Sequence, residues 1–258
     1  MVISEPFGVT LDLWQTLIFE ADGSANSGVR RDLRTERTVK GLAEHGFVVD
    51  PEAVKAQFTK LSVEITSGHD DGVDRHFENW IRLLVDRLVP GVEEKIGLEA
   101  IDAIGLEIDR AFVVSPPHFL DGTHDVLRKL RDRGARVGLI SNTGLTSQDM
   151  YREWFAETGV LDLFDNTTFS NEQAVSKPNP AIFEVCIDGL GTKSANTLHV
   201  GDNMHTDVAG AAKLGMSTVW VEGGTNSRVQ NDVTPDYSVA SILELPEILD
   251  RWLEASSD

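Results

Sequence analysis

The sequence predicts an α/β fold in which a parallel β-sheet carries helices on both faces and an all-helical domain is inserted near its start. Two observations predict it. From about residue 119 onward, short apolar segments of strand length alternate with amphipathic helical segments, the pattern of a parallel sheet. Between residues 24 and 116 the periodicity is helical almost throughout. We therefore expect a core formed by residues 1–23 and 117–258 and a helical domain formed by residues 24–116.

The first strand is expected at Val9–Leu11, directly before Asp12. Four helices of the insertion should follow, separated by short segments with glycine or proline: Arg31–His45, Pro51–Thr66, Val73–Leu88 and Leu98–Val113. The third helix has apolar residues at the spacing of one helix face, which predicts that this face is buried: Phe77, Trp80, Ile81, Leu84 and Leu88. Pro116 and Pro117 then end the insertion, because the residue before a proline is disfavoured in a helix.

The remaining elements alternate regularly, and glycines after three of the helices suit helix ends. The expected strands are short and apolar: Ala135–Ile140, Thr167–Ser170, Thr197–Val200, Ser217–Val221 and Tyr237–Val239. The expected helices lie between and after them: Thr123–Arg133, Ser147–Thr158, Pro180–Leu190, Thr206–Leu214 and Leu243–Trp252.

The 258-residue chain carries 23 basic and 42 acidic residues, a net charge of −19. This excess of negative charge disfavours nucleic acids and anionic membranes as partners. No apolar run approaches the roughly 20 residues that cross a bilayer, and the N-terminal residues lack the features of a signal peptide. The single cysteine, Cys186, cannot form an internal disulfide, which fits a reducing compartment. We expect a cytoplasmic protein whose partner is a small-molecule substrate. An anionic substrate would need a local positive site on this acidic protein.

Two acidic residues stand where predicted strands end. Asp12 follows the first strand, and Asp202 follows Thr197–Val200 and Gly201, a glycine expected to let the chain turn sharply. Strand ends of a parallel sheet form the edge at which ligands bind. Mg²⁺ prefers oxygen ligands, with one or two carboxylates supplied by the protein. We therefore expect Asp12 and Asp202 to bind Mg²⁺, with Asp207 close by at the start of the next helix.

Two further segments contain residues suited to holding an anion. Ser141 and Asn142 end another predicted strand, where a hydroxyl and neighbouring N–H groups can bind an anionic oxygen. The Ser-Asn pair is also common in ordinary turns. Lys177 is followed by Pro178, and Pro180 suits the first turn of the next helix. A lysine held rigidly there could neutralise a nucleophile and a phosphoryl group together.

In this order and spacing, these residues resemble the haloacid dehalogenase (HAD) superfamily of hydrolases, over residues 7–19 and 119–235. The resemblance implies a Rossmann-like core, a helical cap domain inserted after the first motif, and Mg²⁺ as cofactor. It also implies that Asp12 is a nucleophile that attacks phosphorus and forms an aspartyl phosphate. Ser141, with Asn142 beside it, is implied to bind the transferring group, and Lys177 to orient Asp12. The implied metal ligands are Asp12, Asp202 and the main-chain carbonyl of Trp14. Asp207 is implied to support the loop that carries Asp202.

Two positions depart from the phosphatases of that family. Those phosphatases carry an aspartate two residues after the nucleophile, where this chain has Trp14, and Gln15 replaces the usual glycine. That aspartate protonates the leaving group and later activates water, and such assistance is typically worth about 10²–10⁴-fold. Because an indole cannot exchange protons near pH 7, Trp14 predicts a preference for leaving groups that need little protonation, such as acyl phosphates.

Trp14 leaves 2-haloacid dehalogenase activity as an alternative, because the resemblance implies an aromatic residue here in enzymes that expel halide without protonation. Those dehalogenases lack the metal-binding acid that Asp202 supplies in this chain. Their supporting tyrosine would fall at Phe183. Arg30 or Arg31 could serve as their carboxylate-binding arginine or could simply be solvated.

A third alternative is a non-catalytic binding protein. Loss of the aspartate that Trp14 replaces is what decay of an active site would produce. The joint presence of Asp12, Lys177, Asp202 and Asp207 argues against decay.

Two histidine-containing segments have no assigned role in the predicted site. His69, Asp70 and Asp71 have no second group of ligands nearby in the sequence, so we expect a polar turn rather than a metal site. His205 lies within the acidic loop, where it could line the entrance of the site or have no role.

Overall fold

The computed structural model describes residues 5–20, 25–224 and 232–255. Within these residues, six parallel strands form one sheet in the order β5-β4-β1-β6-β7-β8. The strands are β1 (Gly8–Leu11), β4 (Arg136–Ser141), β5 (Asn166–Phe169), β6 (Thr197–Gly201), β7 (Ser217–Val221) and β8 (Tyr237–Val239). The predicted α/β class is confirmed, and β1 lies between β4 and β6 at the centre.

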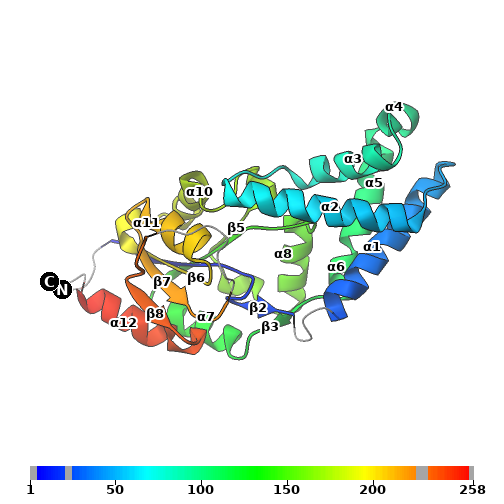
Figure 1. The fold of residues 1–258 in the computed structure, drawn as a ribbon. Helices are drawn as coiled ribbons and strands as arrows, with labels where there is room; N and C mark the ends of the chain where they lie inside the picture. The colour runs from blue at the N-terminus through cyan, green and yellow to red at the C-terminus, as the bar shows by residue number, and fades with distance from the viewer. Residues whose placement is uncertain (1–4, 21–24, 225–231, 256–258) are drawn as a thin grey trace.

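Helices cover both faces of the sheet (Figure 1). Strand residues such as Leu11 and Val200 share one apolar cluster with α7 (Thr123–Asp132), α8 (Gln148–Glu157) and α12 (Leu245–Ala255). A second cluster, which includes Ile140, contains the buried side of α10 (Pro180–Leu190) and Ala211 of α11 (Gly210–Ala212). Shorter helical turns complete the core: η1 (Leu161–Leu163), α9 (Ser170–Gln173), η2 (Ser194–Asn196), η3 (Met204–Ala209) and η4 (Ile242–Glu244).

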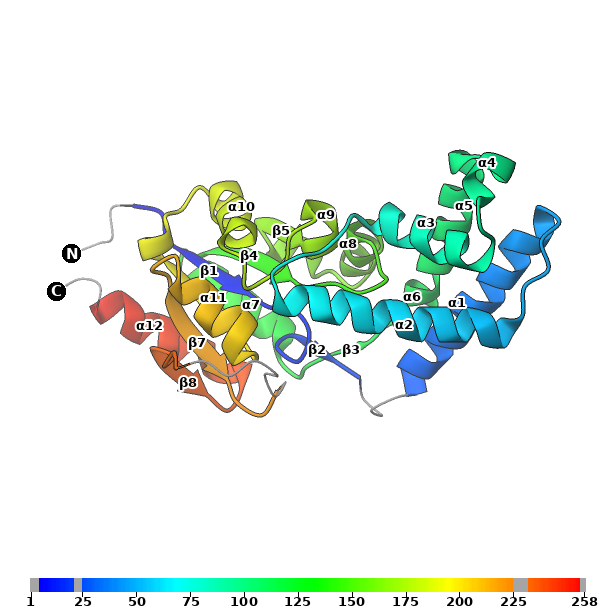
Figure 2. The same cartoon turned by 45° about the horizontal axis from the view of Figure 1, so that its top comes forward.

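Over residues 25–114 the chain forms six helices, which extend away from the sheet (Figure 2). They are α1 (Ala25–Glu44), α2 (Pro51–Asp70), α3 (Phe77–Leu88), α4 (Val92–Ile96), α5 (Leu98–Asp109) and α6 (Ala111–Val114). Most of their buried apolar side chains form a separate cluster, which includes the predicted apolar face of α3. The predicted boundary at residues 23 and 24 lies outside the described residues.

A short antiparallel pair, β2 (Ile18–Phe19) with β3 (His118–Phe119), joins the two chain segments that connect the sheet to these helices. Two-residue strands carry no periodicity, so the sequence does not predict this pair. Helix α4 was also not predicted, and the continuous helix expected over residues 98–113 is divided into α5 and α6 at Arg110. None of the described helices is long and apolar enough to cross a membrane.

Two differences from the predicted elements affect the site. Helix α2 continues to Asp70, one turn beyond the predicted end at Thr66, so that His69 is helical. The predicted helix Thr206–Leu214 begins instead with the π-helical turn η3. Its wide first turn forms because the Asn203 carbonyl accepts hydrogen bonds from the N–H groups of both Asp207 and Val208. Such turns are frequent at functional sites, and this one directs Asp207 toward the sheet edge.

Candidate active site

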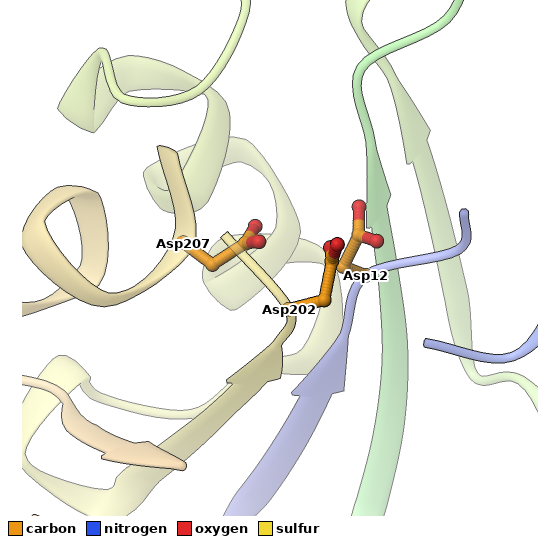
Figure 3. A group of neighbouring side chains, drawn as sticks. All are labelled: Asp12, Asp202 and Asp207. Carbon is orange, nitrogen blue, oxygen red and sulfur yellow. The ribbon is translucent and has the colours of Figure 1, made fainter. Parts of the chain in front are cut away.

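Three carboxylates meet at the C-terminal edge of the sheet (Figure 3). Asp12 follows β1, Asp202 follows β6, and Asp207 points back toward them from η3. One oxygen from each lies within 4.8 Å of the others, and all three residues are buried. The sheet therefore brings together the two acids predicted to bind a metal, Asp12 and Asp202, with Asp207 beside them as expected.

Backbone hydrogen bonds explain how Asp12 and Asp202 are held. The N–H of Asp12 donates to the carbonyl of Val200 at 2.8 Å, so the pairing of β1 with β6 continues one residue beyond β1. In the loop after Asp202, the side chain of Asn203 accepts hydrogen bonds from the N–H groups of His205 and Thr206. This cap fixes the start of η3.

Gly201 is required by close packing rather than by a sharp turn. Its φ lies outside the left-handed region, in contrast to our expectation. A Cβ at this position would lie 2.3 Å from Cγ of Asp207. Only a glycine lets the Asp207 carboxylate approach the backbone of β6 this closely.

Lys177 joins two of the acids. Its Nζ lies 2.5 Å from Oδ1 of Asp12 and 2.6 Å from Oδ1 of Asp207, and its side chain is 1% exposed. The side chain of Asn142 holds the lysine backbone by accepting from the Lys177 N–H at 2.8 Å and donating to the Lys177 carbonyl at 2.9 Å. The predicted contact between Lys177 and Asp12 is therefore present in the structure.

Burial raises the pKa of the Asp12 carboxyl to about 7; Lys177 opposes this shift, and Asp207 and Asp202 add to it. Burial also favours the neutral form of Asp207, but Lys177 and His199 outweigh it and hold the pKa of Asp207 at about 2. Although burial lowers the pKa of Lys177, its two carboxylate partners raise it above the usual range. Lys177 and Asp207 are charged at neutral pH, whereas full ionisation of Asp12 needs a further positive charge.

The donor set fits a divalent cation. Oδ2 of Asp12 is buried and, among the described residues, has no hydrogen-bond partner. Both oxygens of Asp207 are engaged, one by Lys177 and the other by the Asn203 N–H at 3.0 Å. Three carboxylates against one ammonium leave an excess of negative charge in a buried site, which is costly unless a cation neutralises it. A hard cation with oxygen ligands at Asp12 and Asp202 would satisfy the Oδ2 atom and remove that excess.

Ser141 is the last residue of β4, which lies beside β1, and Asn142 follows it. The Ser141 hydroxyl is buried, and its contact with the Asn142 carbonyl is 3.5 Å, long for a hydrogen bond between oxygens. It can therefore turn toward a ligand. The Asn142 side chain is engaged by Lys177, so a contact between Asn142 and an anion would use its main-chain N–H.

Trp14 lies beside the acids with its indole N–H donated to the hydroxyl of Tyr151 at 3.0 Å. Its neighbour Gln15 has a φ of 62°, and the Gln15 N–H donates to the carbonyl of Ile18. The indole is thus a wall of the site rather than a donor to a substrate. The predicted role of the Trp14 main-chain carbonyl as a metal ligand stays a prediction.

A cavity of about 640 Å³ lies between the helices of the insertion and the loops of the core. We call it the site cavity, because Trp14 and Asn142 form part of its wall. Three arginines line it (Arg30, Arg31 and Arg34), and no aspartate or glutamate is among its described lining residues. In a chain with a net charge of −19, this is the local positive environment that an anionic substrate requires.

The arginines differ in their engagement. Arg30 is buried, pairs with Glu20 and donates to the Ser115 carbonyl. Arg31 is exposed at the cavity wall. Arg34, which the sequence analysis missed, donates to the Thr146 hydroxyl at 2.8 Å. The sequence could have indicated Arg34, because it lies four residues after Arg30 and residues at this spacing share one helix face.

Phe183 does not reach the site cavity. It is fully buried in α10 and packs against the ring of His199. His205 lies in η3, with its Nε2 3.0 Å from the carbonyl of Asp70. Of the three residues expected in a polar turn, only Asp71, which follows α2, lies in one, because His69 and Asp70 are helical. His69 belongs to the last turn of α2 and lines the site cavity.

Residues 8–215 match the family model of the haloacid dehalogenase-like hydrolases. The chain belongs to this family. It is 25% identical over 242 residues to a glyceraldehyde 3-phosphate phosphatase of Methanocaldococcus jannaschii, a match that covers 94% of this chain and 96% of the relative. It is 30% identical over 246 residues to a pyrimidine 5'-nucleotidase of Escherichia coli, covering 92% and 98%. The protein is therefore a hydrolase of the HAD family, as the motifs predicted.

Two solved structures show the same fold. A 2-haloacid dehalogenase from Pseudomonas syringae aligns over 96% of this hydrolase and 99% of its own chain, with 20% identity and a TM-score of 0.68. A HAD phosphatase from Thermococcus onnurineus aligns over 94% and 97%, with 22% identity and a TM-score of 0.60. At these identities the likeness concerns the fold alone.

Gly201→Ala should destabilise this hydrolase by about 1–3 kcal/mol, because the added methyl group overpacks a filled site. Activity should fall as well, since Asp207 must move away from Lys177. Urea unfolding measures the first effect. Gly28→Ala in α1 is the matched control, because a Cβ there meets nothing within 4 Å. Equal stability of the two variants would contradict the packing account of Gly201.

Lys177→Met should cost about 3–5 kcal/mol in unfolding free energy without added metal, because removing one partner leaves buried carboxylates uncompensated. Lys213→Met, at an exposed position of the core, provides the control and should change little. Urea titrations in EDTA compare the two. A cost for Lys177→Met as small as that for Lys213→Met would show that the lysine does not stabilise the site.

Proposed function

We propose that this hydrolase cleaves phosphoryl bonds of small anionic substrates with Mg²⁺, through an aspartyl phosphate on Asp12. One observation carries the proposal. Asp12 is held by Lys177 through Oδ1 while its buried Oδ2 has no hydrogen-bond partner in the described part of the chain, at an edge with two further acids. A carboxylate aligned in this way is suited to nucleophilic attack.

The residues then have distinct roles. Lys177 holds Asp12 in place, and its charge offsets the charge of the incoming phosphoryl group. The Ser141 hydroxyl and the Asn142 main-chain N–H bind a phosphoryl oxygen. Asp12 attacks phosphorus, and water then hydrolyses the aspartyl phosphate to restore the carboxylate.

Asp12, Asp202 and the main-chain carbonyl of Trp14 would hold the Mg²⁺, and Asp207 would support them through Lys177 and the loop after Asp202. When bound, the cation would neutralise negative charge on the carboxylates and the phosphoryl oxygens. It would also favour the ionised form of Asp12, which the nucleophile requires.

The substrate class follows from the site cavity. Its arginines and the lack of acids among its described lining residues favour an anionic molecule, and its volume suits a small metabolite. The two curated relatives are named as a phosphatase of a three-carbon phosphate and as a nucleotidase. We further propose that residues 24–116 act as the cap domain that encloses this substrate. The net charge of −19 disfavours a nucleic acid polymer.

A 2-haloacid dehalogenase is the second candidate, favoured by the aromatic side chain of Trp14 and by the cavity arginines. The position of Phe183 in the core, away from the site cavity, disfavours it, as does the presence of Asp202. Mg²⁺ dependence distinguishes the two activities, because displacement of halide by a carboxylate needs no metal.

A substrate panel with Mg²⁺ and with EDTA tests the proposal. We expect phosphate release from p-nitrophenyl phosphate and acetyl phosphate with Mg²⁺, and its loss in EDTA or in Asp202→Asn. Glu247→Gln, at an exposed position of α12, should retain activity. Halide release from 2-chloropropionate in EDTA would instead establish the dehalogenase. Failure to cleave any substrate or to bind Mg²⁺ and BeF₃⁻ would support the non-catalytic alternative.

A further inference from the structure

His69 is held in a network that spans the insertion and the core. Its Nε2 lies 3.0 Å from Oδ2 of Asp74. The buried Asp74 carboxylate also accepts from the indole N–H of Trp80 at 2.8 Å and from the hydroxyl of Ser170 at 2.6 Å. Trp80 belongs to the insertion and Ser170 to the core, so Asp74 is fixed from both sides. With Nε2 directed to Asp74, Nδ1 is the ring atom at which His69 can exchange a proton.

The same histidine lines the site cavity, and its helix end is tied to the loops of the active site. Nε2 of His205 lies 3.0 Å from the carbonyl of Asp70, directly after His69. The carbonyl of Gly72 accepts a hydrogen bond from the N–H of Ser176, the residue before the site lysine, at 3.3 Å. These contacts place the end of α2 against two of the loops that carry the acids and the lysine.

Trp14, two residues after Asp12, cannot supply a proton to a leaving group. The Trp14 indole cannot exchange protons near pH 7, and its N–H is donated to Tyr151. Histidine is the side chain whose ordinary pKa suits proton transfer at that pH. Among the described residues that line the site cavity, His69 is the one histidine.

We propose that His69 protonates the leaving oxygen in place of the missing acid, with Asp74 positioning its ring. The inference rests on the proposed transfer of a phosphoryl group to Asp12. In the first step an oxygen of Asp12 forms a bond to phosphorus, the bond from phosphorus to the leaving oxygen breaks, and the proton on Nδ1 of His69 passes to that oxygen. The products are an aspartyl phosphate, a neutral alcohol and a neutral imidazole.

In the second step, water attacks phosphorus and gives a proton to Nδ1 of His69. The bond between phosphorus and the Asp12 oxygen breaks, which releases inorganic phosphate and restores the carboxylate and the protonated imidazole. The cycle consumes one water and needs no other reactant. Trp14 by itself predicts acyl phosphates as substrates, because their leaving groups need little protonation. With His69 as proton donor, alkyl phosphates, whose leaving alkoxide must be protonated, also become substrates.

His69→Gln tests this role, because the glutamine amide can still donate to Asp74 but cannot exchange protons. The full chain with Mg²⁺ is assayed on acetyl phosphate, p-nitrophenyl phosphate, phenyl phosphate and glycerol 3-phosphate. We expect kcat/KM for the last two to fall by about 10²–10⁴-fold, the usual value of acid–base assistance. For the first two, whose leaving groups need little protonation, the change should stay within a few-fold.

His45→Gln, on the exposed end of the insertion, is the matched control and should leave all four rates unchanged. Thermal unfolding confirms that the variants are folded, and His69→Asn replaces His69→Gln if the latter is not. An equal loss on all four substrates would show a merely structural role for His69, and no loss on any would show no role. Either result overturns the inference.

The wild-type rates separate this inference from the proposed function. Hydrolysis of acetyl phosphate without any hydrolysis of phenyl or glycerol phosphate would overturn the role of His69 and leave phosphoryl transfer to Asp12 intact. Failure on every phosphate would overturn both.

Discussion

Lys177 lies enclosed between the carboxylates of Asp12 and Asp207, and the arrangement of the site depends on this buried contact. An ammonium is desolvated here at a cost that only close partners offset. Asn142 holds the lysine backbone, and Gly201 gives Asp207 the space to reach it. Oδ2 of Asp12 is left without a hydrogen-bond partner among the described residues. The fold keeps Asp12, Lys177 and Asp207 together through the order of its strands and the position of the insertion.

The order of the sheet provides that support. Because β1 lies between β4 and β6, the residues at the ends of these strands meet at one edge, which holds Asp12, Ser141 and Asp202. The insertion completes the site from above that edge. It contributes the arginines of the site cavity and His69, and its contact through Asp74 and Ser170 fixes it against the core. The groups proposed for phosphoryl transfer thus lie on the core, and the groups proposed to face the rest of the substrate lie on the insertion.

Much of this could be predicted from the sequence, because alternating apolar and amphipathic segments locate strand ends, and the acids and Lys177 stand next to them. Contacts between distant segments could not. The hydrogen bond from Ser170 to Asp74 joins residues 96 apart, and no local pattern indicates it. His69 was expected in a polar turn because nothing in the sequence shows that α2 continues one turn further. The reason for Gly201 was also wrong, since its packing partner is known only once η3 is formed.

Trapping of the covalent intermediate tests the central claim most directly. The hydrolase with Mg²⁺ and p-nitrophenyl phosphate is quenched in acid within the first turnover, digested and examined by mass spectrometry. The account predicts a phosphoryl group on the peptide that contains Asp12, and its absence from Asp12→Asn. Phosphate release at the normal rate with no phosphoryl group on Asp12 would contradict it, because water would then attack the substrate directly.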